Sequence, residues 1–332
     1  MSDRKLSYQM AFNEAVSQAM EADENVFAAG EDIGAFGGVF GTYGGLQAKF
    51  GADRVVDTPI SEQAIIGLGI GAAVTGLRPI VDLMFMDFVC VAMDQIVNQA
   101  AKLKYMFGGT ATLPLTITMA GGAGLSAAAQ HSQSLVALLC HIPGLKVIYP
   151  SNPYDMKGLM TACIRDDNPT IMVKHKRLLG MSGIVPEENY AIPLGSAHIA
   201  RPGKDVTVVA YGRMLNESLA AAEELAKEDI DCEVVDPRTL QPLDTATIVA
   251  SVRRTNRVIV VHEAVRFGGL GAEIAAQIQE EAFDYLDGPV ARIGDPFSPV
   301  PFSPVLEQHY LPDATKIAVG IRDVLARPFA RS

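Results

Sequence analysis

The sequence predicts an α/β protein of two domains, each with a mostly parallel sheet flanked by helices. Short apolar runs rich in Val, Ile and Leu alternate along the chain with helical patterns, which is typical of parallel sheets. One stretch without a sustained period, 181–204, separates two such alternating regions and predicts a linker. The length of 332 residues suits two domains of ordinary size.

In the first region, 1–180, the apolar runs predict strands with helices between them. The clearest helix is Gln63–Thr75, which carries Gly67, Gly69 and Gly71 on an apolar background. Each glycine costs a helix about 1 kcal/mol relative to alanine, so we expect another backbone or a flat ligand to approach this helix closely. The strands are expected at Val26–Gly30, Arg54–Asp57, Ile80–Phe85, Leu113–Met119, Leu145–Tyr149 and Thr170–Val173.

The second region, 205–332, repeats the alternation. Its strands are expected at Val206–Ala210, Cys232–Asp236, Arg257–Val261 and Val290–Ile293, and its helices at Glu217–Glu228, Thr245–Val252 and Ala272–Phe283. The proline-rich string 295–304 predicts a rigid surface connection with Phe297, Val300 and Phe302 as apolar anchors.

Composition and charge limit the function classes. The formal net charge of −11 and the lack of a Lys/Arg cluster argue against nucleic acid or anionic membranes and permit a cationic protein partner. No apolar run reaches the roughly 20 residues of a membrane span, and the first residues lack a signal-peptide core, so we expect a cytoplasmic protein. With 49% hydrophobic residues, much surface is expected to be buried against other chains.

The four cysteines lie far apart in the sequence. Cys90, Cys140, Cys163 and Cys232 form no Cys-x-x-Cys pair, which favours reduced core thiols over disulfides or zinc ligands.

The segment Asp57–Ala64 places one carboxylate, Glu62, between a short strand and the glycine-rich helix. An acid in a first helical turn also complements the helix dipole, and that explanation alone would account for Glu62. Open α/β sheets, however, build their binding sites at the carboxyl ends of strands, which is where Glu62 is expected.

The string from Asp57 to Gly76 resembles the pyrimidine-binding segment of a known family. That family is the β subunit of the thiamine-diphosphate-dependent dehydrogenase component of 2-oxo acid dehydrogenase complexes. The resemblance implies a transketolase-like pyrimidine-binding domain followed by a transketolase C-terminal-like domain. It also implies that Glu62 hydrogen-bonds N1′ of the cofactor aminopyrimidine and favours the imino tautomer, whose N4′ takes the proton from the thiazolium C2.

The resemblance extends to two further cofactor-binding residues. Glu31, in Gly30-Glu31-Asp32, matches a glutamate near the cofactor amino group and the substrate channel; a solvated turn carboxylate is the alternative. Phe88, in Phe85-Met86-Asp87-Phe88, matches the aromatic residue that lies against the aminopyrimidine ring; ordinary core packing is the alternative.

A second catalytic candidate follows the glycine-rich string 121–124. His131, within Ala127–Ser134, matches a family histidine implicated in proton handling as the acyl group passes to lipoamide. Imidazole exchanges protons near neutral pH and suits a thiol leaving group. A loop histidine bonded to backbone is the alternative.

The resemblance also implies metals and partners. A structural potassium ion would be held by Leu115, Cys163, Ile164, Asp166 and Asn168. The Gly-Asp-Gly string that holds Mg²⁺ and the diphosphate is absent, so Mg²⁺ would be held by an α subunit that shares the thiamine diphosphate site. The implied assembly is an α2β2 heterotetramer that docks on a dihydrolipoyl acyltransferase core through the C-terminal assembly domain, 205–332.

Substrate choice and two rival functions complete the predictions. The strings 82–85, 98–102 and 105–109 resemble the acetoin type of that family most closely, which implies acetoin or pyruvate as the substrate, with a branched-chain 2-oxo acid as an alternative. A non-catalytic assembly subunit is a second alternative. A nucleotide-binding oxidoreductase is not favoured, because the Gly-x-Gly-x-x-Ala string 67–72 lies inside a helix instead of on the turn after a strand.

Overall fold

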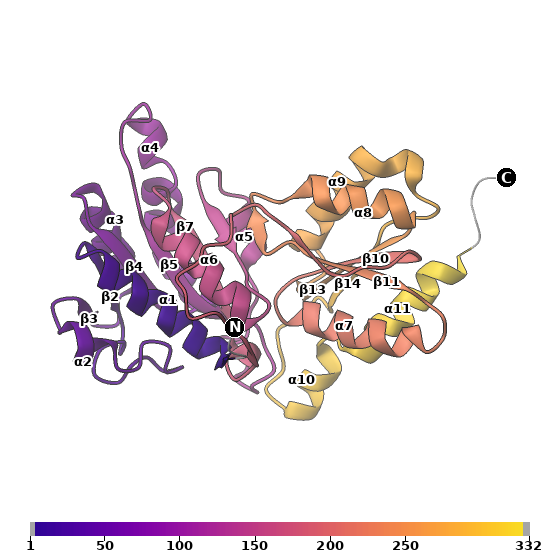
Figure 1. The fold of residues 1–332 in the computed structure, drawn as a ribbon, viewed down its shortest axis with the longest axis horizontal. Coiled ribbons are helices and arrows are strands. Elements are labelled where there is room, and N and C mark those ends of the chain that lie inside the picture. The colour runs from indigo at the N-terminus through magenta and orange to yellow at the C-terminus, as the bar shows by residue number, and fades with distance from the viewer. Residues whose placement is uncertain (1–3, 328–332) are drawn as a thin grey trace. The chain divides into compact units, whose positions relative to one another are not determined.

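The computed structural model describes residues 4–327, which divide into two compact units (Figure 1). The first comprises the chain up to Gly121 together with Leu138–Leu194. The second comprises Gly122–Ala137 together with the chain from Gly195 onward. The segment that carries His131 therefore belongs to the second unit, although it lies in the sequence between strands of the first.

The first unit is built on a parallel sheet. Its strands run in the order β6 (Lys146–Ile148), β7 (Thr170–His175), β5 (Thr116–Gly121), β4 (Arg78–Phe85), β2 (Val26–Gly30) and β3 (Val55–Asp57). The central strands β5 and β7 are buried along their whole length, as expected for strands covered on both faces.

Helices cover both faces of this sheet. On one face α1 (Tyr8–Ala22) and α6 (Pro153–Arg165) form a shared core with alternate strand residues such as Ile80. On the other face α3 (Glu62–Val74) lies so close to the sheet that a Cβ added to Gly69 would come within 2.9 Å of Val81. The remaining elements are α2 (Leu46–Phe50), the 3₁₀ helix η1 (Met86–Ala92), the π-helical turn η2 (Gln95–Ala100), α4 (Leu103–Met106), α5 (Val136–Cys140), η3 (Lys176–Leu178) and the antiparallel pair β1 (Lys5–Ser7) and β8 (Ser182–Ile184).

The helices begin where local chemistry favours it. Ser7 accepts a hydrogen bond from the backbone N–H of Met10 and caps α1. Asn152 caps α6 in the same way, and Pro153 occupies the first helical position, where no N–H is needed.

The second unit has a smaller sheet. Its order is β14 (Ala291–Asp295), β13 (Val258–Val265), β10 (Val206–Ala210), β11 (Cys232–Asp236) and β9 (His198–Arg201), with only β9 antiparallel. Figure 1 shows α8 (Thr245–Thr255) and α9 (Leu270–Ala282) on one face, and α7 (Arg213–Ala226) and α11 (Ala314–Ala326) on the other. β12 (Thr239–Gln241), η4 (Phe283–Tyr285) and α10 (Pro304–Tyr310) complete the unit.

The predicted α/β class is confirmed, and every predicted strand is present with boundaries shifted by a few residues at most. The expected linker 181–204 contains two short strands, β8 and β9. The expected anchoring of the proline-rich string was wrong for two side chains: Val300 is buried, but Phe297 is 78% and Phe302 is 71% exposed.

All four cysteines are free, so no disulfide forms among them. Cys163 and Cys232 are buried as predicted, whereas Cys90 is exposed and is not a core thiol. Between residues 4 and 327, no helix combines the length and the apolar character that crossing a bilayer requires.

Candidate active site

Three adjacent parallel strands deliver predicted site residues to one edge of the first sheet. Gly30 at the end of β2 lies opposite Asp57 of β3 and Asp82 of β4. Glu31 follows β2 directly, Glu62 opens the helix after β3, and Phe88 lies in the helix that follows β4. The sheet therefore brings Glu31, Glu62 and Phe88 to one region, the carboxyl edge where open α/β sheets bind ligands.

The two carboxylates interact electrostatically. Burial raises the pKa of Glu31, and the negative charges of Asp32 and Glu62 raise it further. Hydrogen bonds join the segments that follow β2 and β3: Thr58 N–H donates to the Gly30 carbonyl (3.0 Å), and Gly34 N–H donates to Asp57 Oδ1 (2.6 Å). The edge thus holds an acid with increased proton affinity beside a second acid at a helix start.

Phe88 belongs to a small aromatic group. Its ring meets that of Phe85 edge to face, with centroids 5.9 Å apart, and Phe85 meets Phe40 in the same way at 5.3 Å. Phe88 is half-buried, so one part of its surface packs in the protein and another part remains accessible.

A buried ion pair lies within the same sheet, next to this edge. Lys174 Nζ donates to Asp82 Oδ2 (2.6 Å), and both side chains are almost fully buried. Asp82 Oδ1 accepts from the N–H of Met84, whose φ of +58° lies in the left-handed region and turns the chain toward Phe85. The sequence prediction missed this pair. An acid within the apolar run Ile80–Phe85 was the available signal, since buried strands rarely contain one without a partner.

His131 lies in a loop of the second unit. Its backbone N–H donates to the Ala128 carbonyl (3.4 Å), and Gly122 N–H donates to the Gln133 carbonyl (3.2 Å), which joins the two ends of the loop. The His131 side chain is half-buried. Two buried acids that the sequence prediction missed, Glu263 and Glu307, accept hydrogen bonds from the loop backbone.

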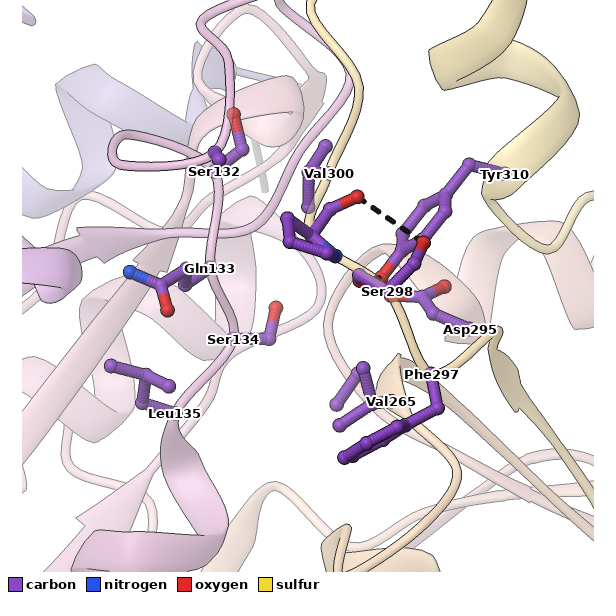
Figure 2. A pocket seen from close by; sticks show the side chains of 13 residues that line it. Ser132, Gln133, Ser134, Leu135, Val265, Asp295, Phe297, Ser298, Val300 and Tyr310 are labelled. Atoms are coloured by element: carbon purple, nitrogen blue, oxygen red, sulfur yellow. Dashed lines mark hydrogen bonds between the residues drawn. The ribbon is translucent and has the colours of Figure 1, made fainter.

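A cavity of about 330 Å³ lies beside this loop in the second unit (Figure 2). Ser132, Ser134, Asp295, Val300 and Tyr310 are among its lining residues. Asp295 is 5% exposed, and burial, followed by the charge of Glu263, raises its pKa to about 8. It is the one ionisable side chain besides Tyr310 in the described lining.

The oxygens predicted to hold potassium have partners within the first unit. Leu115 O accepts from Thr170 N–H (2.9 Å), Cys163 O from Asp166 N–H (3.2 Å) and Ile164 O from Arg78 (3.0 Å). Lys146 pairs with the Asp166 carboxylate, and Lys104 donates to Asn168 Oδ1 (2.8 Å).

These lysines contact the side-chain oxygens that a cation would use, so both lysines would have to move before a potassium ion could bind there. The predicted potassium site at Leu115, Cys163, Ile164, Asp166 and Asn168 stays a prediction. Within residues 4–327, no cluster of three or more His, Cys, Asp and Glu is arranged to hold a metal ion.

The strand-edge residues do fit an aminopyrimidine. A flat heteroaromatic ring with a basic nitrogen and an amino group needs a carboxyl partner and an apolar face. Glu62, the adjacent Glu31 and the accessible ring of Phe88 supply groups of these kinds on neighbouring strands.

Two family models match the chain. Residues 4–181 match the pyrimidine-binding domain of transketolase, and residues 195–317 match the transketolase C-terminal domain. A solved split-gene transketolase, described as an inactive beta4 tetramer, has the same fold, with a TM-score of 0.78 at 23% identity over 96% of this chain and 98% of that one.

Curated relatives are similar over nearly the full length. The β subunit of acetoin:2,6-dichlorophenolindophenol oxidoreductase from Cupriavidus necator is 51% identical over 97% of this chain and 98% of the relative. Its counterpart from Bacillus subtilis is 48% identical over 98% of each chain. The pyruvate dehydrogenase E1 β subunit of Rickettsia felis is 43% identical over 96% of this chain and 98% of the relative. The chain therefore belongs to the thiamine-dependent family of acetoin and pyruvate dehydrogenase E1 β subunits, oxidoreductase components built from two transketolase-like domains.

Proposed function

We propose that this chain is the β subunit of an acetoin-cleaving dehydrogenase component and supplies half of its thiamine diphosphate site. The observation that carries the proposal is the convergence of Glu31, Glu62 and Phe88 at the ends of three adjacent strands. The 51% and 48% identity to two acetoin-oxidising β subunits supports acetoin as the substrate.

Each residue at the strand edge has one task. Thiamine diphosphate, when bound, supplies the nucleophilic carbon that attacks the substrate carbonyl. Glu62 holds a proton at N1′ of the aminopyrimidine, Phe88 orients the ring, and Glu31 lines the side of the amino group. A glutamine at position 62 could bond to N1′ but could not exchange a proton with it.

His131 serves the transfer to the lipoyl group. Acetoin is cleaved to acetaldehyde and an acetyl unit, and one sulfur of the lipoyl disulfide takes that acetyl unit. The S–S bond breaks, the electron pair released by cleavage of the acetoin C–C bond reduces it, and the second sulfur takes a proton. We assign the donation of that proton to His131, because imidazole is a suitable donor near neutral pH.

The other half of the site comes from an α subunit. The sequence contains no Gly-Asp-Gly string for Mg²⁺ and the diphosphate, which supports an α2β2 heterotetramer. The C-terminal domain is assigned to assembly and to docking on the dihydrolipoyl acyltransferase core. The formal net charge of −11 would attract a basic docking domain, and added salt would weaken this attraction.

Other substrates and roles are less well supported. The branched-chain alternative is not favoured, because the 2-oxoisovalerate dehydrogenase β subunit of Bacillus subtilis is 40% identical, against 51% for the acetoin relative. Pyruvate ranks second at 43%. A non-catalytic assembly subunit would not need Glu31, Glu62 and Phe88 at one sheet edge.

A substrate panel tests the proposal. The α and β chains are reconstituted with thiamine diphosphate and Mg²⁺, and kcat/KM is measured for acetoin, pyruvate and branched 2-oxo acids with 2,6-dichlorophenolindophenol as acceptor. We expect the highest value for acetoin. Preference for pyruvate would move the chain to the pyruvate enzymes, and no turnover of any substrate would favour the assembly role.

A further inference from the structure

The loop that carries His131 has an unfavourable backbone conformation. Gly122 and Gly124 have φ values of +83° and +96°, which glycine tolerates. Ser126 (φ +53°) and Ala128 (φ +63°) also lie in the left-handed region, where residues with a Cβ are uncommon. A loop with two such residues keeps its shape only when surrounding groups hold it.

Two buried carboxylates of the same unit hold the first half of this loop. Glu307, on α10 and 3% exposed, accepts from Gly124 N–H through Oε1 (2.8 Å), and from Ser126 N–H (2.8 Å) and Ser126 Oγ (3.2 Å) through Oε2. Glu263, on β13 and 6% exposed, accepts from Ala123 N–H through Oε1 (2.6 Å). The carboxylates thus accept from the backbone N–H groups of three loop residues, of which Ala123 is buried and Gly124 and Ser126 are half-buried.

The second half of the loop borders a cavity. Ala129, Ser132 and Gln133 are among the residues that line this volume of about 330 Å³. Ser132 Oγ is buried and has no hydrogen-bond partner among the described residues. Figure 2 shows Ser132, Gln133 and Ser134 on one side of the cavity and Val300, Asp295 and Tyr310 on the other. Glu263 and Glu307 therefore bond to the half of the loop that precedes the cavity-lining residues, and they reach His131 through the backbone.

We propose that Glu307 and Glu263 are positioning residues that set the place of His131 for proton donation to the lipoyl sulfur. The inference rests on the role proposed for His131 above. The two acids act through the loop, because they accept hydrogen bonds from Ala123, Gly124 and Ser126. The hydrogen bond from Gly122 N–H to the Gln133 carbonyl joins the two ends of the loop, so a shift of the first half also shifts the backbone around His131.

Glu307→Gln weakens the hold of Glu263 and Glu307 on the loop, called the clamp below, with little change in shape. The amide keeps one acceptor oxygen and points an N–H₂ group at a backbone N–H, so one of the two backbone bonds is lost and two donors face each other. Glu263→Gln tests the same clamp from β13 instead of from the helix α10. Glu228→Gln is the matched control, since Glu228 is an exposed acid of the same unit that pairs with Arg322 on the surface.

The variants are measured in the assembled α–β enzyme with two acceptors, a lipoyl domain and 2,6-dichlorophenolindophenol. We expect Glu307→Gln to lower the lipoyl-dependent rate by about tenfold or more, as for a displaced acid–base group, and to leave the artificial-acceptor rate within about twofold. Glu263→Gln should act in the same direction, and Glu228→Gln should change neither rate.

A double-mutant cycle separates positioning from a general loss of structure. Because the clamp acts through His131, His131→Ala combined with Glu307→Gln should lose no more lipoyl-dependent activity than His131→Ala alone. Losses that add would overturn the proposal, as would a wild-type lipoyl-dependent rate in Glu307→Gln. If His131→Ala itself keeps full lipoyl-dependent activity, the role of His131 fails instead. Should Glu307→Gln fail to assemble, the cycle is run with Glu263→Gln.

Discussion

At the scale of single residues, the buried acids of the second unit differ in how they are satisfied. Glu263 and Glu307 accept backbone hydrogen bonds, whereas Asp295 Oδ1 is buried without a hydrogen-bond partner among the described residues. An acid buried in this way resists ionisation, and the pKa of Asp295 is accordingly raised to about 8.

This pKa predicts how stability depends on pH. Between about pH 4 and the folded-state value of about 8, the unfolded chain releases the Asp295 proton while the folded chain keeps it, so the contribution to stability falls as pH rises. Asp295→Asn removes the ionisable group, so it should raise the free energy of unfolding of the assembled enzyme above neutral pH by roughly a few kcal/mol. Thermal unfolding at several pH values checks this. An unchanged pH profile in the variant would contradict it.

His131 gives a second prediction at this scale. His131→Ala should lose roughly 10²–10⁴-fold in the lipoyl-dependent rate while turnover with an artificial acceptor is kept, because proton donation to sulfur occurs in the first assay only. Stopped-flow or steady-state rates with both acceptors provide the measurement. An equal loss in both assays would assign His131 to an earlier step or to the folding of its loop.

At the scale of elements, two of the three glycines of α3, Gly69 and Gly71, have different surroundings. A Cβ at Gly69 would come within 2.8 Å of Leu115 and 2.9 Å of Val81, so the sheet itself excludes a side chain there. At Gly71 a Cβ would meet nothing within 4 Å, and Gly71 lies on the exposed side of the helix near Leu68, which is 43% exposed. The close approach expected from the sequence thus occurs within this chain at Gly69, whereas at Gly71 no described atom lies close enough to exclude a side chain.

Paired substitutions test this difference. Gly69→Ala should destabilise the enzyme by about 1–3 kcal/mol through overpacking. Gly71→Ala should not destabilise the fold of this chain, since alanine favours a helix by up to about 1 kcal/mol. Because Gly71 is exposed, we expect the substitution to weaken association with the α chain instead. Unfolding midpoints and size-exclusion chromatography of the α–β mixture report the two effects. Equal destabilisation by both substitutions would refute the assignment.

The sequence predicted the long elements and missed those that depend on distant partners. Strands such as Val206–Ala210 are buried on both faces, so their apolar runs are unambiguous. The strands β8 and β9 are short, partly exposed edge strands without such a run. Glu307 was missed because its partners are backbone N–H groups 181–183 residues away, which leave no trace in side-chain patterns. Glu31, Glu62 and Phe88 were identified through the family resemblance, and their place at the sheet edge could be predicted because each comes within five residues after the end of a strand.

At the scale of the whole molecule, the chain is expected to hold only part of its cofactor. Its proposed site holds the aminopyrimidine, and the sequence contains no Gly-Asp-Gly string for Mg²⁺ and the diphosphate. We therefore expect no tight binding of thiamine diphosphate by the isolated β chain and tight binding by the α–β assembly. Calorimetric titration with cofactor and Mg²⁺ measures both, and stoichiometric binding to the β chain alone would refute the shared site.

The most direct test of the central claim is proton exchange at the cofactor C2 in the reconstituted enzyme, followed by proton NMR after acid quench. Glu62 is proposed to contact N1′ of the aminopyrimidine. Glu62→Gln should therefore assemble normally and bind cofactor but lose C2 exchange, because the amide cannot exchange a proton with the ring. Glu228→Gln, on the surface of the other unit, should exchange like the wild type. Wild-type exchange in Glu62→Gln would remove Glu62 from the mechanism and leave the helix-dipole explanation of that residue.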